Sequence, residues 1–527
     1  MKTPKTLRSY VEGRWHEAGS GFAPLIDPST EEVVAQASSA GIDFGAVLDF
    51  ARRQGGPALR ALAFRDRAQL LKDMGKVLRE HRDELLELSR INSGTTTPDG
   101  AFDVDGASGT LAWYAAFGKT LGDRTFLVEG DAIALSRSEA FWGRHLLVPR
   151  QGVAVHVNAF NFPAWGFAEK AACALLAGMP VVTKPATATA LVTERAVELI
   201  IEAGILPAGA LQLIIGSTGD LLDRLGAQDV FAFTGSADTA LTLRGRKNLL
   251  AASTRVNIEA DSLNAAVLGP DVAGESATLE LFLKDVVREI TQKAGQKCTA
   301  VRRILVPEAQ AEAVSAALAE RLGQVVTGNP AEPGVTMGPL ATEQQLQDAV
   351  KGVAELRQSA RLLAGTGERA DGAGSPAGKG FFFPPVLLRS DDPRAASAVH
   401  EREVFGPVAT VLVYGGGADE AAEIVALGGG TLVTSVYSDD AAWAGQFFAG
   451  AGCTTGRVYW GSAASAPEAP GSGIVLPQVL HGGPGRAGGG EEVGGIVGLR
   501  PYLQRVAVQG SKPLLEELAG VAGGEVR

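Results

Sequence analysis

The sequence predicts an α/β fold built on a doubly wound parallel sheet. Between about residue 150 and residue 260, five short runs rich in β-branched residues alternate with segments of helical character. Strands that alternate with helices pair in parallel, because each helix returns the chain to the same edge of the sheet. Ligands of such sheets bind beyond the carboxyl ends of the strands. The predicted strands are Val153–Val157, Val181–Thr183, Leu211–Ile215, Val230–Thr234 and Val256–Ile258.

The chain has the size and composition of a globular enzyme with two or three domains. Its 527 residues are 46% hydrophobic and 20% charged, which is enough for a large core. The net charge is −11 (48 basic against 59 acidic residues), so nucleic acid and anionic membranes are poor partners. No secretory signal and no apolar run of ~18 residues is present. Three distant cysteines argue against disulfides and a thiolate zinc site, so we expect a soluble cytoplasmic protein without a metal.

Further elements flank the predicted sheet. Apolar residues between Leu70 and Leu78 recur at helical spacing, which predicts an amphipathic helix packed on a core. A second mixed α/β region runs from about residue 268 to 480, and its glycine-rich Ala364–Gly380 is typical of an exposed loop. The glycine-rich stretch Gly482–Glu492 is most simply interpreted as a flexible linker, after which Tyr502–Val508 predicts another strand.

Cys298 is the first candidate catalytic residue. It lies in the segment Ala294-Gly295-Gln296-Lys297-Cys298-Thr299-Ala300. A thiol of ordinary pKa, about 8.5, is only a few per cent thiolate at pH 7, so a reactive cysteine must be approachable and electrostatically favoured. The small residues around Cys298 allow such an approach. A buried packing cysteine is the alternative, and it is the better interpretation of Cys173 in an apolar helical run. Cys453, after a glycine, is expected to be partly exposed.

Polar residues follow several of the predicted strands. Lys184 follows the second strand, and Thr234-Gly235-Ser236 opens a helix whose backbone N–H groups could receive a phosphate. Ser217 lies in another short glycine turn, although no G-x-G-x-x-G motif is present. Glu259 ends the fifth strand. A carboxylate there is usually a solvated loop residue, but it acts as a general base if partial burial raises its pKa toward 7.

Six short motifs follow one another along the chain. They are Asn161-Phe162-Pro163, Lys184-Pro185, Phe233-Thr234-Gly235-Ser236, Glu259, Gly295-Gln296-Lys297-Cys298 and Glu403-Val404-Phe405-Gly406-Pro407. In this order and spacing they resemble the aldehyde dehydrogenase superfamily over essentially the whole chain. The resemblance implies that Cys298 attacks the aldehyde carbon as a thiolate. The Asn161 amide and the backbone N–H of Cys298 would hold the oxyanion. Glu259 would activate the water that hydrolyses the resulting thioester to a carboxylic acid.

The same resemblance implies a nicotinamide dinucleotide as cofactor. Lys184 would hydrogen-bond the adenosine ribose, Glu403 would hydrogen-bond the nicotinamide ribose, and Phe405 would pack near the nicotinamide. Thr187 stands where many NAD-preferring relatives have a glutamate, and a neutral side chain removes the repulsion of a 2′-phosphate. We therefore expect NADP rather than NAD, although Thr187 could merely begin a helix. The expected cofactor-binding residues are Phe160, Lys184, Ala186, Thr187, Ser217, Thr234, Gly235, Ser236, Glu403 and Phe405.

Four stretches differ from the sequence motifs that are most common in the superfamily. They resemble the branch that oxidises coenzyme A-linked semialdehydes in the breakdown of aromatic compounds such as benzoate and phenylacetate. The chain ends at Arg527 without room for the hydratase domain of the bifunctional members, which favours a stand-alone dehydrogenase. His156 and His481 lie in these stretches, and the simplest expectation is that neither side chain contacts the substrate. The stretches are His156–Pro163, Lys184–Ala190, Glu259–Asn264 and His481–Gly490.

The resemblance also implies a division into three parts and an oligomer. Residues 1–135 and 152–267 would form a dinucleotide-binding domain, and residues 268–480 a catalytic domain. Residues 136–151 and 481–527 would form an oligomerisation element of a homodimer or a dimer of dimers. Two other functions remain open: a dehydrogenase of free small aldehydes, and a non-catalytic scaffold protein. The presence of Asn161, Glu259 and Cys298 together counts against the scaffold.

Overall fold

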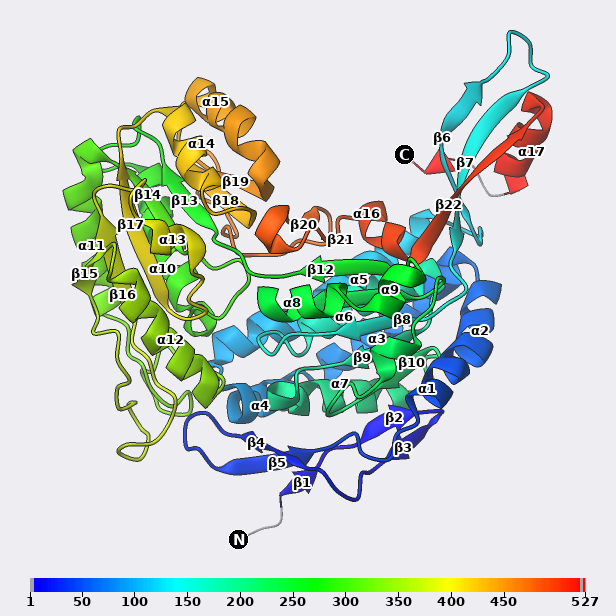
Figure 1. Ribbon diagram of the computed structural model, residues 1–527, viewed down its shortest axis with the longest axis horizontal. Helices are drawn as coiled ribbons and strands as arrows, with labels where there is room; N and C mark the ends of the chain where they lie inside the picture. The colour runs from blue at the N-terminus through cyan, green and yellow to red at the C-terminus, as the bar shows by residue number, and fades with distance from the viewer. Residues whose placement is uncertain (1–3, 522–524, 527) are drawn as a thin grey trace.

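The five predicted strands lie side by side in one seven-stranded sheet, which confirms the predicted fold class. The computed structural model describes residues 4–521 and 525–526 (Figure 1). Strand β8 (Ala154–Val157) is the middle one of these five. β9 (Val181–Lys184) and β10 (Leu211–Leu213) lie on one side of it, and β11 (Val230–Thr234) and β12 (Arg255–Glu259) on the other. All four pairings among these strands are parallel. The order reverses at β8, where such sheets bind their ligands.

Helices cover this sheet and build the largest core. The predicted helix around residue 74 is α3 (Phe64–Glu80), which packs against α5 (Thr97–Thr120) and α6 (Trp165–Ala177). Cys173 of α6 is buried in this core, as expected, whereas Cys453 is exposed. Other elements around the sheet are β2 (Ser9–Val11), β3 (Arg14–His16), α1 (Phe44–Phe50), α2 (Gly56–Ala61), α4 (Arg82–Ser93), α7 (Ala190–Glu202), α8 (Ala237–Arg244) and α9 (Lys247–Ala251). A small separate sheet contains β1 (Lys5–Thr6), β4 (Ala23–Ile26) and β5 (Val33–Ala37).

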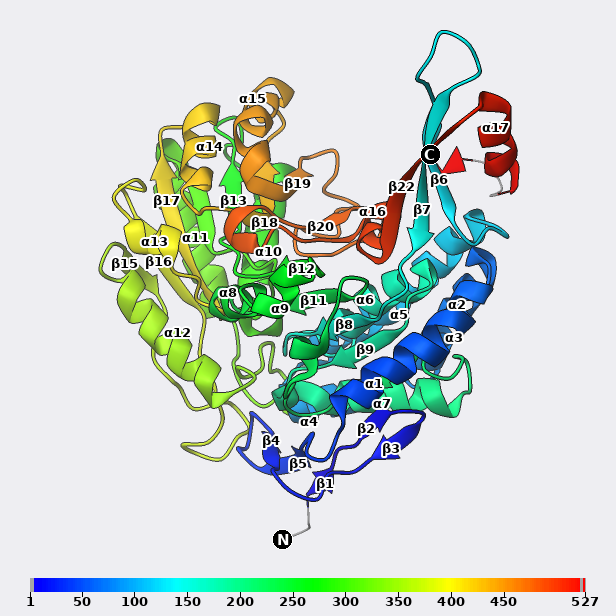
Figure 2. The ribbon, with the colours of Figure 1, turned by 45° about the vertical axis from the view of Figure 1, so that its right-hand side comes forward.

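A second seven-stranded sheet follows after a linker of only five residues, 260–264. Its centre is β14 (Arg303–Pro307), flanked by β13 (Ala265–Leu268) and β17 (Val408–Tyr414), and only the edge strand β15 (Arg361–Ala364) is antiparallel. Figure 2 shows this sheet and its helices facing the first sheet across the molecule. The remaining elements are β16 (Val386–Ser390), β18 (Thr431–Tyr437), β19 (Thr455–Gly461), α10 (Ala277–Thr291), α11 (Ala311–Gly323), α12 (Glu343–Leu356), α13 (Ser397–Glu401), α14 (Ala418–Ala426) and α15 (Ala441–Ala451).

A third, four-stranded sheet projects away from the other two (Figure 1, upper right). Its central pair is β7 (Trp142–Pro149) and β6 (Leu127–Ala134), which run antiparallel. The edge strand β22 (Leu503–Gly510) pairs antiparallel with β7, and β23 (Glu525–Val526) pairs parallel with β6. Helix α17 (Lys512–Val521) packs beside it. The sheet therefore begins before residue 136, where the oligomerisation element was expected to begin. Residues 522–524 and 527 of that expected element, and residues 1–3 of the first domain, lie outside the described residues.

The segment Gly482–Glu492 is not a flexible linker, contrary to the sequence expectation. Its ends belong to the paired strands β20 (Leu480–Gly482) and β21 (Glu491–Val493), after which α16 (Ile496–Leu499) leads to β22. The Gly490 N–H donates to the carbonyl oxygen of Ile258 at 3.0 Å, and a Cβ on Gly488 would lie 2.3 Å from that same oxygen. Glycines are needed here because the segment lies directly against the backbone of β12.

No helix in the described part of the chain is long and apolar enough to cross a membrane.

Candidate active site

Two cavities meet at Cys298 and Glu259. The larger, of about 1650 Å³, lies at the carboxyl edge of the first sheet and extends to α12 and Glu403 of the second region. The smaller, of about 480 Å³, lies between α6 and the segment around Gly473. A large cleft and a smaller pocket thus share one boundary. The residues that line both are Asn158, Ala159, Asn161, Thr234, Glu259 and Cys298.

The loop that carries Cys298 has an unusual backbone. Lys293 and Ala294 adopt the left-handed conformation, with φ of 53° and 52°, and Gly295 follows with φ of 67°. Non-glycine residues in this region cost on the order of 1 kcal/mol or more each, and such strain gathers at functional sites. A Cβ on Gly295 would lie 2.3 Å from the carbonyl oxygen of Gly406. The motifs around Cys298 and Phe405, far apart in sequence, therefore pack backbone to backbone.

Arg302 ties these two loops together. Its guanidinium donates to the carbonyl oxygens of Gly406 at 2.8 Å and of Gly295 at 3.0 Å. It also forms an ion pair with Glu403 at 3.4 Å. Burial raises the pKa of Glu403 to about 7, although Arg302 opposes that rise. Because Arg302 comes immediately before β14, the second sheet fixes both the Cys298 loop and the carboxylate that faces the larger cleft.

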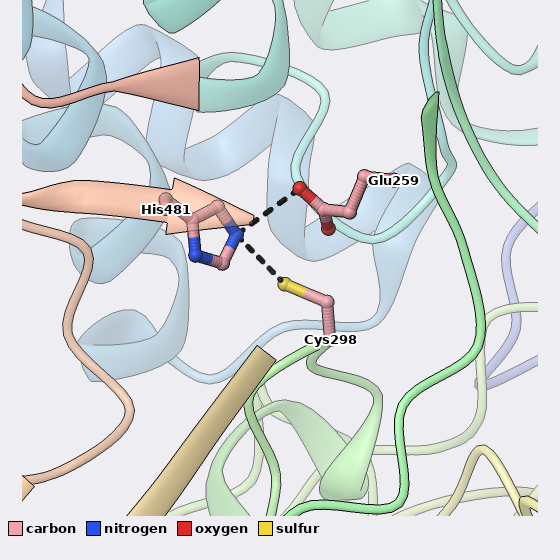
Figure 3. Close-up of side chains that lie close together, drawn as sticks. All are labelled: Glu259, Cys298 and His481. Carbon is pink, nitrogen blue, oxygen red and sulfur yellow. Dashed lines mark hydrogen bonds and ion pairs between the residues drawn. The ribbon is translucent and has the colours of Figure 1, made fainter. Parts of the chain in front are cut away.

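Glu259, His481 and Cys298 form a buried cluster (Figure 3). The Nε2 atom of His481 lies 3.1 Å from Glu259 Oε2 and 3.7 Å from Cys298 Sγ. The side chains of Glu259 and His481 are each only 3% exposed. Three ionisable side chains therefore meet around one nitrogen atom.

The pKa of Glu259 moves opposite to the sequence expectation. Burial alone would raise it, but the charge and hydrogen bond of His481 outweigh burial and lower the pKa of Glu259 to about 2. Glu259 in turn raises the pKa of His481 against the effect of burial. Burial and the neighbouring Glu259 also raise the pKa of Cys298 well above its usual range. The expectation of a base with a pKa near 7 was wrong because it did not include His481.

A second buried ionic group stands behind Glu259. Lys170 Nζ lies 3.0 Å from Glu492 and 3.2 Å from Glu169, and its side chain is 2% exposed. Although burial opposes it, the two carboxylates raise the pKa of Lys170, while burial raises that of Glu492 to about 7. Sequence reasoning did not find these residues. The signal was present, because Glu169 and Lys170 are the two charged residues in the otherwise apolar α6.

Aromatic side chains form one wall of the smaller cavity. Phe102, Phe162 and Trp165 pack edge to face, with ring centroids 5.3 to 5.8 Å apart. Val475 adds an aliphatic surface. This wall suits the hydrocarbon part of an aldehyde. His156, by contrast, is fully buried and bonds to the hydroxyl of Tyr502 at 3.1 Å, outside both cavities, as its ordinary interpretation expects.

Seven of the ten expected cofactor residues line the larger cleft. Ser236 is the N-cap of α8, and the hydroxyl of Thr234 is buried without a partner among the described residues. An unpartnered hydroxyl at a strand end fits a polar ligand that bonds there. The seven are Phe160, Ala186, Thr234, Gly235, Ser236, Glu403 and Phe405.

The other three expected residues lie at or after the ends of the neighbouring strands β9 and β10. Lys184 is the last residue of β9, and Thr187 follows three residues later. The Thr187 hydroxyl donates to the carbonyl oxygen of Gly216, next to Ser217, at 3.4 Å. Burial without a compensating anion lowers the pKa of Lys184 to about 8. A lysine in this condition fits a site that receives hydroxyls or phosphate from a ligand. The chain's residues therefore fit a nicotinamide dinucleotide.

Fold and site together define a dehydrogenase with a cysteine beside a dinucleotide cleft. Residues 15–507 match the aldehyde dehydrogenase family, and the chain belongs to that family. It is an oxidoreductase that acts on aldehydes with a nicotinamide dinucleotide, as the sequence predicts. The individual roles of the site residues remain proposals.

Two relatives of named activity are similar to this chain over most of its length. The chain is 46% identical to 3,4-dehydroadipyl-CoA semialdehyde dehydrogenase of Aromatoleum evansii, over 91% of this chain and 93% of the relative. It is 27% identical to the NADP-linked succinate-semialdehyde dehydrogenase of Escherichia coli K12, over 79% of this chain and 82% of the relative.

Solved structures share the fold at 24% identity. Lactaldehyde dehydrogenase from Escherichia coli superposes with a TM-score of 0.84, over 96% of this chain and 99% of that one. Betaine aldehyde dehydrogenase from Staphylococcus aureus, in complex with NAD+, has a TM-score of 0.83 over 96% and 95%.

Proposed function

We propose that this enzyme oxidises the aldehyde group of a coenzyme A-linked semialdehyde to a carboxylic acid, with NADP as electron acceptor. The proposed substrate is 3,4-dehydroadipyl-CoA semialdehyde, on the similarity to the Aromatoleum relative. The observation that carries the proposal is that Cys298 and Glu259 stand where the cofactor cleft and the substrate pocket meet. A nucleophile and a base at that boundary reach the same carbon atom in turn.

The first step forms a covalent bond between Cys298 and the aldehyde. The thiolate sulfur adds to the carbonyl carbon, and the electron pair of the C=O bond moves to oxygen. The Asn161 amide and the backbone N–H of Cys298 donate to this oxyanion, and each such donor typically contributes about 3 kcal/mol. Asn161 lines both cavities, as this role requires.

The larger cleft would hold the cofactor. Ser236 at the start of α8 would support the pyrophosphate, and Glu403 and Lys184 would bond the two ribose groups. When bound there, the cofactor would supply the acceptor for the hydride of the former aldehyde carbon, and the acyl group would remain on Cys298 as a thioester. Thr187 supports NADP over NAD, because it places no negative charge near a 2′-phosphate.

Glu259 would then activate the water that hydrolyses the thioester. With a pKa near 2 it is ionised at neutral pH, so it can take a proton from water as the oxygen attacks the acyl carbon. The C–S bond breaks and the thiolate is restored. A carboxylate in this position supports a carboxylic acid as product rather than transfer of the acyl group to free coenzyme A.

The test is reduction of NADP by purified Cys298→Ala protein beside the parent, with Cys453→Ala as the matched control. Cys298→Ala is expected to bind NADP normally and to have no turnover, whereas Cys453→Ala, altered at an exposed thiol, keeps full activity. Persistent oxidation by Cys298→Ala would refute the covalent mechanism. Comparison of the coenzyme A-linked semialdehyde with a free aldehyde of equal chain length tests the substrate, and equal kcat/KM values would favour a free aldehyde.

We also propose that the protein is cytoplasmic and that the third sheet joins copies of the chain into a homodimer or a dimer of dimers. Large apolar side chains are exposed on it, which supports such an interface. Sedimentation of the parent and of a Val506→Glu variant tests this, with a smaller species expected for the variant. The exposed residues are Ile133, Leu135, Phe141, Val506 and Leu514.

A further inference from the structure

The surroundings of Cys298 oppose its ionisation. The residue lies in a buried loop, and the carboxylate of Glu259 faces its sulfur. A thiolate in that position would be desolvated and beside a like charge, and both effects disfavour it. The nucleophile therefore needs a positive charge next to it when the proton leaves. The proposed function of Glu259 as the base for water does not supply one.

His481 is placed to supply that charge. It belongs to β20, which is held by its pairing with β21 and by the glycine segment that lies against β12. Its Nδ1 atom has no partner among the described residues, so the interactions of the ring run through Nε2. That atom faces Glu259 and the sulfur of Cys298 together (Figure 3).

We propose that His481, kept as an imidazolium by its contact with Glu259, stabilises the thiolate of Cys298 through Nε2–H. The inference rests on the proposed role of Cys298 as nucleophile. The S–H bond breaks, its electron pair stays on sulfur, and the proton leaves to solvent water. The net charge of the three side chains changes from 0 to −1, whereas without the imidazolium it would change from −1 to −2. Cysteine–histidine pairs of this kind hold thiolates at neutral pH in other enzymes.

Other charged groups around His481 do not replace it. The raised pKa of His481 reflects Glu259, then Glu169, against burial and the opposing charge of Arg457. Lys170 is held by Glu169 and Glu492 rather than by the sulfur. The titratable and charged groups that face His481 are Glu169, Lys170, Glu259, Cys298, Arg457 and Glu492.

The proposal gives the two residues different roles. His481 stabilises the thiolate before the aldehyde is attacked, and Glu259 accepts the water proton after hydride transfer. The first half of the reaction should therefore depend on His481 more than on Glu259. The second half should depend on Glu259.

The test measures alkylation of each cysteine by iodoacetamide across pH, read by peptide mass, in the parent, His481→Phe and His481→Asn. In both variants the pH midpoint for Cys298 should rise by at least about one unit, with about tenfold slower alkylation at pH 7. Cys453 is exposed and serves as the internal reference, whose rate should not change. Cys173 is buried and reports unfolding if it reacts.

A Cys298 midpoint that is unchanged in the folded variants overturns the inference. If Cys173 reacts in His481→Phe, the smaller polar change His481→Asn decides the result. A structural role alone would change the amplitude of reaction but not the pH midpoint. Loss of turnover in Cys298→Ala is a separate result, so failure of the His481 inference is distinguishable from failure of the proposed function.

Discussion

The side-chain amide of Asn264 donates a hydrogen bond to the carbonyl oxygen of Cys298, at 2.7 Å. It donates a second one to Ala300 at 2.9 Å, and its own oxygen accepts from the backbone N–H of Val433. Asn264 ends the five-residue linker that follows Glu259. One buried side chain therefore connects the linker after the proposed base with the loop that carries the proposed nucleophile.

Asn264→Ala should weaken both the fold and the activity. The change leaves two buried carbonyl oxygens and one N–H without their partner, and each such loss costs about 1 to 3 kcal/mol. We expect a free energy of unfolding lower by about 3 kcal/mol in urea denaturation. Turnover should fall with it, because the Cys298 loop is released. Asn264→Asp keeps the shape but not the two donors, so a stable Asp variant would show that these bonds contribute little.

Glu259→Gln should separate hydride transfer from hydrolysis. The amide preserves the shape of the side chain but cannot take a proton from water, so the enzyme should perform one oxidation and stop as the thioester. Rapid mixing should show a burst of reduced cofactor close to one equivalent of active sites, followed by a very slow steady state. Glu491→Gln, a change at an exposed neighbour of the cluster, is the control. Parent-like steady turnover in Glu259→Gln would assign water activation to another residue.

Thr187→Glu should reverse the preference between cofactors. A carboxylate accepts hydrogen bonds from a ribose 2′-hydroxyl and repels a 2′-phosphate, so kcat/KM with NADP should fall at least about tenfold relative to NAD. Thr187→Ser retains a neutral hydroxyl and should keep the parent ratio. Parallel kinetics with both cofactors give the result. An unchanged ratio in Thr187→Glu would place the 2′-phosphate elsewhere.

Cofactor affinity should fall as pH rises through the pKa of Lys184. Burial lowers this pKa to about 8 in the free enzyme, so the ammonium group is present below that pH and is lost above it. Its charge and its hydrogen bonds to the ribose are lost with the proton. The dissociation constant of NADP, measured by fluorescence titration, should therefore increase above pH 8. Lys184→Arg, which stays charged, should flatten the profile, and an equally steep rise in that variant would exclude Lys184 as the cause.

The sequence was sufficient to predict the features that depend on local residue patterns. Both boundaries of strand β11 were predicted correctly, because a buried run of aromatic and aliphatic residues ends before Gly235. The strand ends then placed Lys184, Thr234 and Glu259 at one edge of the sheet. The motif resemblance supplied the family and the proposed nucleophile.

The features that the sequence did not predict depend on contacts between segments that are far apart in the chain. The segment after His481 looked like a linker because its order comes from contact with the backbone of β12, not from its own residues. His481 lies 183 residues from Cys298, and no local signal linked the two. The expectation that the pKa of Glu259 is raised was wrong for the same reason, since the histidine that lowers this pKa comes from that distant segment.

The most direct test of the account is the mass of the trapped intermediate. Glu259→Gln is mixed with the aldehyde and NADP, quenched in acid, digested, and searched for peptides that carry the acyl group. The account predicts one acyl adduct, on the peptide that contains Cys298, formed in step with the burst of reduced cofactor. An adduct on Cys173 or Cys453, or a burst without any adduct, would contradict it.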